Sequence, residues 1–195
     1  MFANRNFDPS VAFSPSWGLG RLLAFFLFCL SNSFGGVGNF SLYLDENRSL
    51  WGMGDNDNGQ LGDGTLTERN QPYEISTSRG ILDFAHGMDH TLYVEDDGSL
   101  WATGDNAYGQ LGVGDLVDRN ESVKIVDANV TAVAAGMHHS VFVKRDGSLW
   151  TMGRNDYGQL GNGNGLQQTT PTKVVVAGVV SIAAGSHHTC FVKWD

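Results

Sequence analysis

Three aligned stretches decide the fold: LWGMGDNDNGQLGDG at 50–64, LWATGDNAYGQLGVG at 100–114 and LWTMGRNDYGQLGNG at 149–163. They align without gaps, and successive copies start 50 and 49 residues apart. Related blocks extend the pattern outward: SLYLDENRSL at 41–50, GMDHTLYVEDDGSL at 87–100, GMHHSVFVKRDGSL at 136–149 and GSHHTCFVKWD at 185–195. Chance does not place so many blocks at one spacing, so the chain is a tandem repeat of about fifty residues.

Each copy predicts four short strands separated by glycine turns. The Asp-Gly pairs at 97–98 and 146–147 predict tight hairpins, because this dipeptide tolerates the positive φ that such turns need. We expect the first strands at 81–85, 131–135 and 180–184, and the second strands at 91–95, 140–144 and 189–193. The third strands are expected to include residues 100–101 and 149–150, and the fourth strands are expected at 72–76, 123–127 and 172–176.

Evenly spaced five-residue strands are typical of a β-propeller. The second strands are apolar on both faces, which a sheet stacked between two other sheets requires. We therefore predict an all-β structure after about residue 37, a partial β-propeller of about three four-stranded blades. The 26 glycines, only 4 prolines and 41% hydrophobic residues agree with a short-stranded globular fold.

The block Gly-Asp/Arg-Asn followed by Gly-Gln-Leu-Gly resembles the signature of the regulator of chromosome condensation repeat. The upstream Gly-x-x-His-Ser/Thr and the Asp-Gly-Ser-Leu-Trp that follows it fit the same family. The resemblance covers about 41–195, with units near 41–90, 91–139 and 140–188 and a partial unit at 189–195. Relatives usually have seven blades, so the chain is expected to be an open arc or a fragment of a larger seven-blade propeller.

The repeated residues of the motif are expected to be structural, because a binding site usually gathers its residues in one place. The glycines permit positive φ, the amides bond loop groups, and the resemblance implies that the second histidine of each copy satisfies backbone groups between strands. These residues are Gly54, Asn56, Gly59, Gln60 and Gly62; Gly104, Asn106, Gly109, Gln110 and Gly112; Gly153, Asn155, Gly158, Gln159 and Gly161; and His90, His139 and His188.

The sequence contains no nucleophile elbow, P-loop, zincin motif or pair of catalytic carboxylates, and we expect neither an enzyme nor a cofactor. Equivalent histidines fall in successive blades, too far apart for one zinc ion, so no metal site is expected. Trp51, Trp101 and Trp150 are expected in the blade core, and so is Cys190, whose sister copies have leucine and valine.

Residues 1–33 resemble a secretory leader. Arg21 precedes the apolar run LLAFFLFCL at 22–30, and small residues follow. Nine apolar residues are too few to span a bilayer. Residues 21–33 thus predict a secreted protein, extracellular or periplasmic, whose mature domain is 34–195. An apolar strand or helix of the fold and a membrane anchor are the alternatives for this segment.

The formal net charge of −9 argues against nucleic acid as a direct partner, since it lacks the basic surface that phosphates attract. The function that fits best is a non-enzymatic binding scaffold for protein or glycan partners, secreted or at the cell surface. The alternative, implied by the family, is guanine-nucleotide exchange on a small GTPase. The exchange-factor members use a protruding wedge hairpin, and no insertion interrupts the spacing here.

About three repeats cannot close a ring of seven blades. Uncovered blade faces and strand edges invite pairing with other chains. We therefore expect the protein to continue past Asp195 or to self-associate through its unclosed blade edges.

Overall fold

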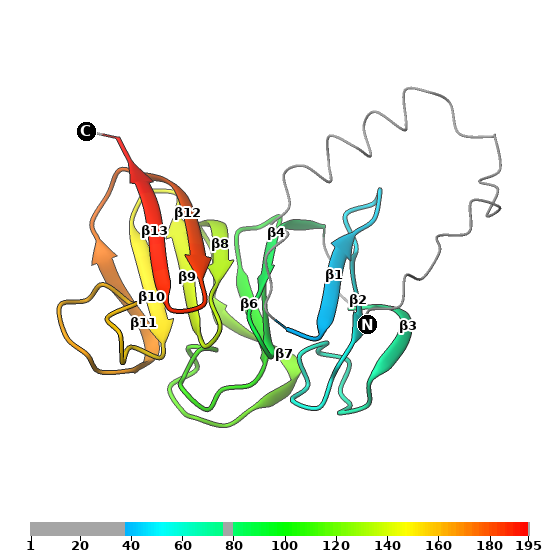
Figure 1. Cartoon of the computed structure of the whole chain (residues 1–195). Coiled ribbons are helices and arrows are strands. Elements are labelled where there is room, and N and C mark those ends of the chain that lie inside the picture. The colour runs from blue at the N-terminus through cyan, green and yellow to red at the C-terminus, as the bar shows by residue number, and fades with distance from the viewer. Residues whose placement is uncertain (1–37, 76–79, 195) are drawn as a thin grey trace, which may run out of the picture. The chain divides into compact units, whose positions relative to one another are not determined.

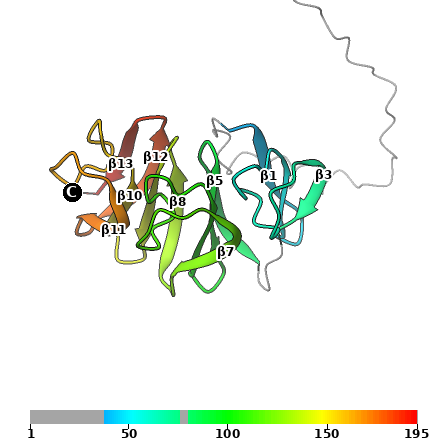
Figure 2. The same ribbon diagram turned by 90° about the horizontal axis from the view of Figure 1, so that it is seen from below.

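Thirteen antiparallel strands make up four sheets in the computed structural model, which describes residues 38–75 and 80–194. Every regular element in these residues is a strand, as predicted (Figure 1). The sheets follow one another in chain order and stay unclosed (Figure 2).

The first sheet has three strands and the last has two, while the two between them are complete four-stranded blades. The first contains β1 (Phe40–Leu44), β2 (Leu50–Gly54) and β3 (Arg69–Glu74). The second contains β4 (Ile81–His86), β5 (His90–Glu95), β6 (Leu100–Gly104) and β7 (Arg119–Val126). The third contains β8 (Val130–Ala135), β9 (His139–Lys144), β10 (Leu149–Gly153) and β11 (Gln168–Val175). The last contains β12 (Val179–Gly185) and β13 (His188–Lys193). For brevity we call these sheets blades A, B, C and D.

The Asp-Gly hairpins form as the sequence predicts. Gly98 and Gly147 have φ of 80° and 74°, in the left-handed region. Their amides donate to Glu95 and Lys144, which end β5 and β9. A Cβ on Gly98 would stand 2.7 Å from the Asn129 amide nitrogen, so the turn needs glycine for space as well as for φ.

The fourth strands β3, β7 and β11 begin three or four residues earlier than predicted. Their first residues pair with Gly54, Gly104 and Gly153, and the pairing shifts register soon afterwards. These strands lie at the outer edge of each blade and alternate poorly between apolar and polar residues, so the pattern placed their start too late.

The core lies between blades. One cluster joins Leu92, Val94 and Leu111 of blade B to Val133 and Phe142 of blade C. A second joins blades A and B, and a third joins blades C and D. All six residues of β5 are buried, as expected for a second strand covered on both faces.

The tryptophans lie at the margin of this core and are only half-buried. The Trp101 ring stacks on Tyr93 with centroids 6.3 Å apart, and Trp150 stacks on Phe142 at 6.0 Å. The Nζ of Lys124 lies 5.0 Å from the Trp101 ring centroid. The expectation of core tryptophans is therefore only partly right: one face packs and the other meets lysine and solvent.

Cys190 is exposed, so the prediction of a core cysteine is wrong. It lies in β13, where His188, Cys190 and Val192 are all exposed. The equivalent β5 and β9 are each covered by a following sheet, whereas no described residues cover this side of β13.

Candidate functional site

The motif asparagines stabilise the loop between the third and fourth strand of each blade. Asn56, Asn106 and Asn155 are fully buried. Their Oδ1 atoms accept from the amides of Leu61, Leu111 and Leu160 at 2.9, 3.0 and 3.0 Å. Their Nδ2 atoms donate to loop carbonyls nine to eleven residues ahead. Each side chain replaces the backbone pairs that the loop cannot make.

The motif glutamines fix the same loops. Gln60, Gln110 and Gln159 are buried, and their Oε1 atoms accept from the amide two residues before each of them. The motif glycines adopt positive φ, which allows the backbone of each loop to turn tightly. They are Gly54, Gly59 and Gly62; Gly104, Gly109 and Gly112; and Gly153, Gly158 and Gly161.

The histidines of β5 and β9 connect neighbouring blades through a hydroxyl. His90 Nε2 lies 3.0 Å from Ser140 Oγ on the next blade, and Ser140 donates to the Gln110 carbonyl at 2.7 Å. His139 Nε2 meets Thr189 Oγ1 at 3.0 Å, and Thr189 donates to the Gln159 carbonyl at 2.8 Å. Since the hydroxyl proton goes to the carbonyl, the histidine donates from Nε2. The link therefore runs between blades and reaches the backbone through a hydroxyl, unlike the expected contact between strands.

Burial keeps these two histidines neutral. It lowers the pKa of His90 to about 3 and that of His139 to about 4. A charged ring at either position would lose its water without gaining an acceptor.

Side chains that differ between the copies meet one another at the loop ends. We call this set the loop-end row, and it consists of Asp89, Asp105, Tyr108, His138, Arg154, Tyr157 and His187. Its members come from three positions of the repeat: Asp105 and Arg154 from the first, Tyr108 and Tyr157 from the second, and Asp89, His138 and His187 from the third. The first copy has Asp55 and Asn58 at the first two positions, and these lie outside the row. The backbone fixes the row, since the amides of Asp105 and Arg154 donate to the carbonyls of Asp89 and His138.

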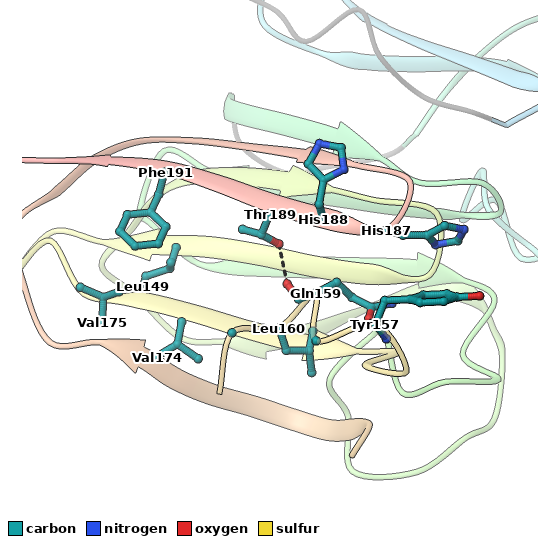
Figure 3. Close-up of a pocket in the computed structure, with 12 residues that line it drawn as sticks. Leu149, Tyr157, Gln159, Leu160, Val174, Val175, His187, His188, Thr189 and Phe191 are labelled. Carbon is teal, nitrogen blue, oxygen red and sulfur yellow. Dashed lines mark hydrogen bonds between the residues drawn. The ribbon is translucent and has the colours of Figure 1, made fainter. Parts of the chain in front are cut away.

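The later half of the row is aromatic and cationic. The Tyr108 and His138 rings are 5.0 Å apart, as are those of Tyr157 and His187 (Figure 3). The Arg154 guanidinium lies 4.9 Å from the Tyr108 ring and 5.9 Å from the Tyr157 ring. Tyr157 is 68% exposed, so an aromatic face with a cation at its edge is open to solvent.

The earlier half of the row is acidic. Burial raises the pKa of Asp89, and the nearby carboxylates of Asp105 and Asp55 raise it further. Burial also raises the pKa of Asp105, but contacts from His138 and the Ala107 amide outweigh that, and its net pKa is lowered. His138 Nδ1 lies 3.7 Å from Asp105 Oδ2. Along the chain the row thus changes from the carboxylates of Asp89 and Asp105 to tyrosine, histidine and arginine side chains.

A pocket of about 330 Å³ opens beside β13, lined by Leu149, Leu160, Val175 and Phe191 among others (Figure 3). Leu149 and Leu160 are themselves almost completely buried, and so are their equivalents in blade B, Leu100 and Leu111, which pack in the core cluster between blades B and C. The walls of this pocket are therefore ordinary surface between blades, and we do not assign it a ligand.

No group of three or more His, Cys, Asp or Glu side chains in 38–75 and 80–194 could hold a metal ion. The same residues contain no helix that is long and apolar enough to cross a bilayer. The leader at 1–33 lies outside the described residues.

The loop-end row was missed by sequence reasoning. The repeated motif contains only what the copies share, and Tyr108 and His138 are thirty positions apart in the chain. The available signal was the opposite one: the few positions at which well-aligned copies differ in charge or aromatic character.

Comparisons with known proteins agree with this architecture. The model of the regulator of chromosome condensation (RCC1) repeat matches residues 49–94, 97–143 and 146–192, and a second model of this repeat matches 130–159. A comparison with curated proteins gave no match.

Two solved structures share the fold. One is Prp20p from Saccharomyces cerevisiae, described with its binding properties to Gsp1p and histones. It is 23% identical, with a TM-score of 0.66 over 80% of this chain and 42% of that one. The other is yeast RCC1 (Prp20) with Kap60 bound, again 23% identical with a TM-score of 0.66, over 80% of this chain and 38% of that one. The chain thus spans less than half the length of these relatives.

The three repeat matches cover well over half of the sequence, and the observed blades have the fold of these propellers. The chain belongs to the regulator of chromosome condensation (RCC1) repeat family.

Proposed function

We propose that this chain is a non-enzymatic binding scaffold for a protein or glycan partner, and that the loop-end row is its binding surface. One observation carries the proposal. The loops keep the buried asparagine and glutamine constant, while the residues that differ contact one another: Asp105 lies near His138, and Arg154 packs on the Tyr108 ring. A rigid loop that presents changing side chains is a typical way for a scaffold to acquire a partner.

The composition of the row supports binding. Tyrosine and arginine dominate the energetics of many interfaces, because they bring large contact areas and directed polar groups. Arg154 is held between Tyr108 and Tyr157 and is paired with Asp156 at 2.7 Å, so little side-chain freedom is lost when a partner docks. Exposed tyrosine rings also suit the apolar faces of sugars.

The place of action is proposed from the leader. Arg21 and the apolar run at 22–30 favour a secreted or cell-surface protein, extracellular or periplasmic. Expression in a host with an export system should give a chain processed near Ser33. Mass spectrometry that finds only the unprocessed chain in the cytosol would contradict this part.

The binding surface is tested by removing its aromatic half. The variant with Tyr108→Ser and Tyr157→Ser should lose its ligand on a glycan array or in a pull-down from extracellular material. Its melting temperature should change little, because Tyr157 is mostly exposed. The control is Leu116→Ser with Val117→Ser, which removes exposed apolar residues from a loop outside the row. Equal binding by wild type and both variants would refute the assignment of the row.

Nucleotide exchange on a small GTPase is the alternative, and it rests on the family resemblance. Release of labelled nucleotide from a panel of small GTPases separates it from the scaffold. Acceleration by this chain would favour exchange, and an unchanged release rate would leave the scaffold as the better proposal.

Self-association is the second part of the proposal. The last sheet leaves Phe191, Val192 and Trp194 at least 46% exposed. Uncovered apolar strands of this kind favour pairing with another chain.

A further inference from the structure

Two kinds of polar contact are found both where blade B meets blade C and where blade C meets blade D. The first is the histidine-to-hydroxyl bond, His90 to Ser140 and His139 to Thr189, at 3.0 Å in both places. The second is a row of backbone bonds: the Met88 amide donates to the Met137 carbonyl, and the Met137 amide donates to the Ser186 carbonyl, both at 3.2 Å. The chain therefore forms the same interface twice with the same groups.

The outer side of β13 offers the first half of a third such interface. His188 occupies the position of His90 and His139 and is exposed. Figure 3 shows its ring on the opposite side of β13 from Thr189 and Phe191. Cys190 and Val192 share the side of His188, because side chains alternate along a strand. Their counterparts in β5, Leu92 and Val94, are fully buried against blade C.

The outer side of β1 offers the second half. Ser41 pairs with Met53 as Ser140 pairs with Met152, so Ser41 occupies the position of the accepting hydroxyl. Ser41 is exposed, and its hydroxyl makes no hydrogen bond to another described residue. Tyr43 lies two positions further on the same side and is 38% exposed, whereas its counterpart Phe142 is fully buried in the contact with blade B.

We propose that two copies of this chain associate head to tail, with β13 of one copy stacked on β1 of the next, and with His188 donating to the Ser41 hydroxyl. This rests on the self-association proposed above and names its surfaces. A second copy is the occupant that the chain itself specifies, because it carries both halves of an interface that it already forms internally. The Ser186 amide, which follows the Met88 and Met137 amides in the backbone row, would continue that row across the contact.

Head-to-tail contact has a distinctive consequence. The two surfaces differ, so each copy that binds leaves a free β13 at one end and a free β1 at the other. Assemblies therefore grow past the dimer unless two copies close into a ring, in which both contacts are made within the dimer. A contact of β13 with β13 would stop at the dimer.

Sedimentation of the full chain from micromolar to millimolar concentration tests the contact. The average mass should rise with concentration above that of the monomer. Val192→Asp places an unpaired charge in the contact and should raise the dissociation constant at least about tenfold. The matched control Val117→Asp adds the same charge to an exposed loop of blade B and should associate like wild type. A constant monomer mass, or equal loss in both variants, would overturn the proposal.

Cross-linking tests the geometry. In a Cys29→Ser background, Ser41→Cys leaves one thiol on β1 and the native Cys190 on β13. A short bismaleimide should then give a ladder of linked species from open assemblies, or a linked dimer from a closed pair, in far higher yield than with the chain that has Cys190 alone. Val117→Cys, in place of Ser41→Cys, is the control for random collision. A ladder no stronger than that control would refute the head-to-tail arrangement.

These outcomes are separable from failure of the binding surface. The loop-end variants should change ligand binding and leave the mass unchanged, and Val192→Asp should do the reverse.

Discussion

Replacing Gly109 by alanine tests how the loops pack against the next blade. Gly109 and Gly158 have nearly the same φ, 77° and 74°, in equivalent turns. A Cβ on Gly109 would lie 2.6 Å from the Cα of Thr169 in β11, whereas a Cβ on Gly158 would meet nothing within 4 Å. The pair therefore separates backbone strain from steric contact at one kind of turn.

The magnitudes follow from these two geometries. Alanine in the left-handed region destabilises the folded state by about 1–2 kcal/mol. Replacing glycine also lowers the conformational entropy of the unfolded chain, which offsets about 0.4–1 kcal/mol of that loss. Gly158→Ala should therefore lower the free energy of unfolding by about 1 kcal/mol. Gly109→Ala adds a steric clash with the Thr169 backbone, which cannot move away as a flexible side chain could. Overpacking of this kind typically costs about 1–3 kcal/mol more.

Urea unfolding followed by tryptophan fluorescence, with melting temperatures measured in parallel, decides between them. In a domain of this size a loss of 1 kcal/mol lowers the melting temperature by about 2–4 °C. Gly109→Ala should therefore melt about 4–16 °C below wild type, and Gly158→Ala about 2–4 °C below. Equal losses in the two variants would show that blade packing does not restrict Gly109.

Two further predictions concern buried polar groups. Burial depresses the pKa of His90 and His139 below the ordinary 6.5, so the unfolded chain binds their protons more tightly. The stabilisation is complete above pH 6.5 and is lost as the pH falls towards the folded-state pKa, about 4 for His139 and about 3 for His90, by at most about 1.4 kcal/mol per pH unit for each histidine. Urea midpoints at pH 7.5, 6 and 5 measure this loss, and a flat profile would contradict the burial argument. Asn106→Ala leaves the Leu111 amide without its acceptor and should cost about 1–3 kcal/mol of unfolding free energy. The same change at Asn58, a side chain at the loop surface, should cost less than about 0.5 kcal/mol, and a similar loss at both would refute the assigned role.

Much of the fold could be predicted because the repeat supplied its own alignment. Four copies of one pattern showed where strands and turns fall, and Asp-Gly at 97–98 and 146–147 marked the hairpins by its φ requirement alone. The fourth strands were placed less well. Their side chains face solvent and the loop, so hydrophobic periodicity says little about where they begin.

The environment of a single position could not be predicted from its sister copies. Cys190 was assigned to the core because Leu92 and Val141 are apolar, yet burial depends on which sheet comes next and not on the strand itself. The environment of Trp101 and Trp150 was likewise not predictable from the strand alone. Their size suggested the core, while the lysines that cover their outer faces come from neighbouring strands, at spacings that no local motif records.

The candidate site follows from the difference between repeated and changing residues. An asparagine such as Asn106 recurs because every loop has the same orphaned amides to satisfy, so repetition reports on folding. Selection for a partner acts on the assembled surface, where each blade supplies a different part. The change from Asp105 to Arg154 at one loop position reverses the charge and alters neither the strands nor the turn around it. Variation of this kind costs the fold little and changes the surface strongly, which makes the differing positions the most informative place to look for function in a repeat protein.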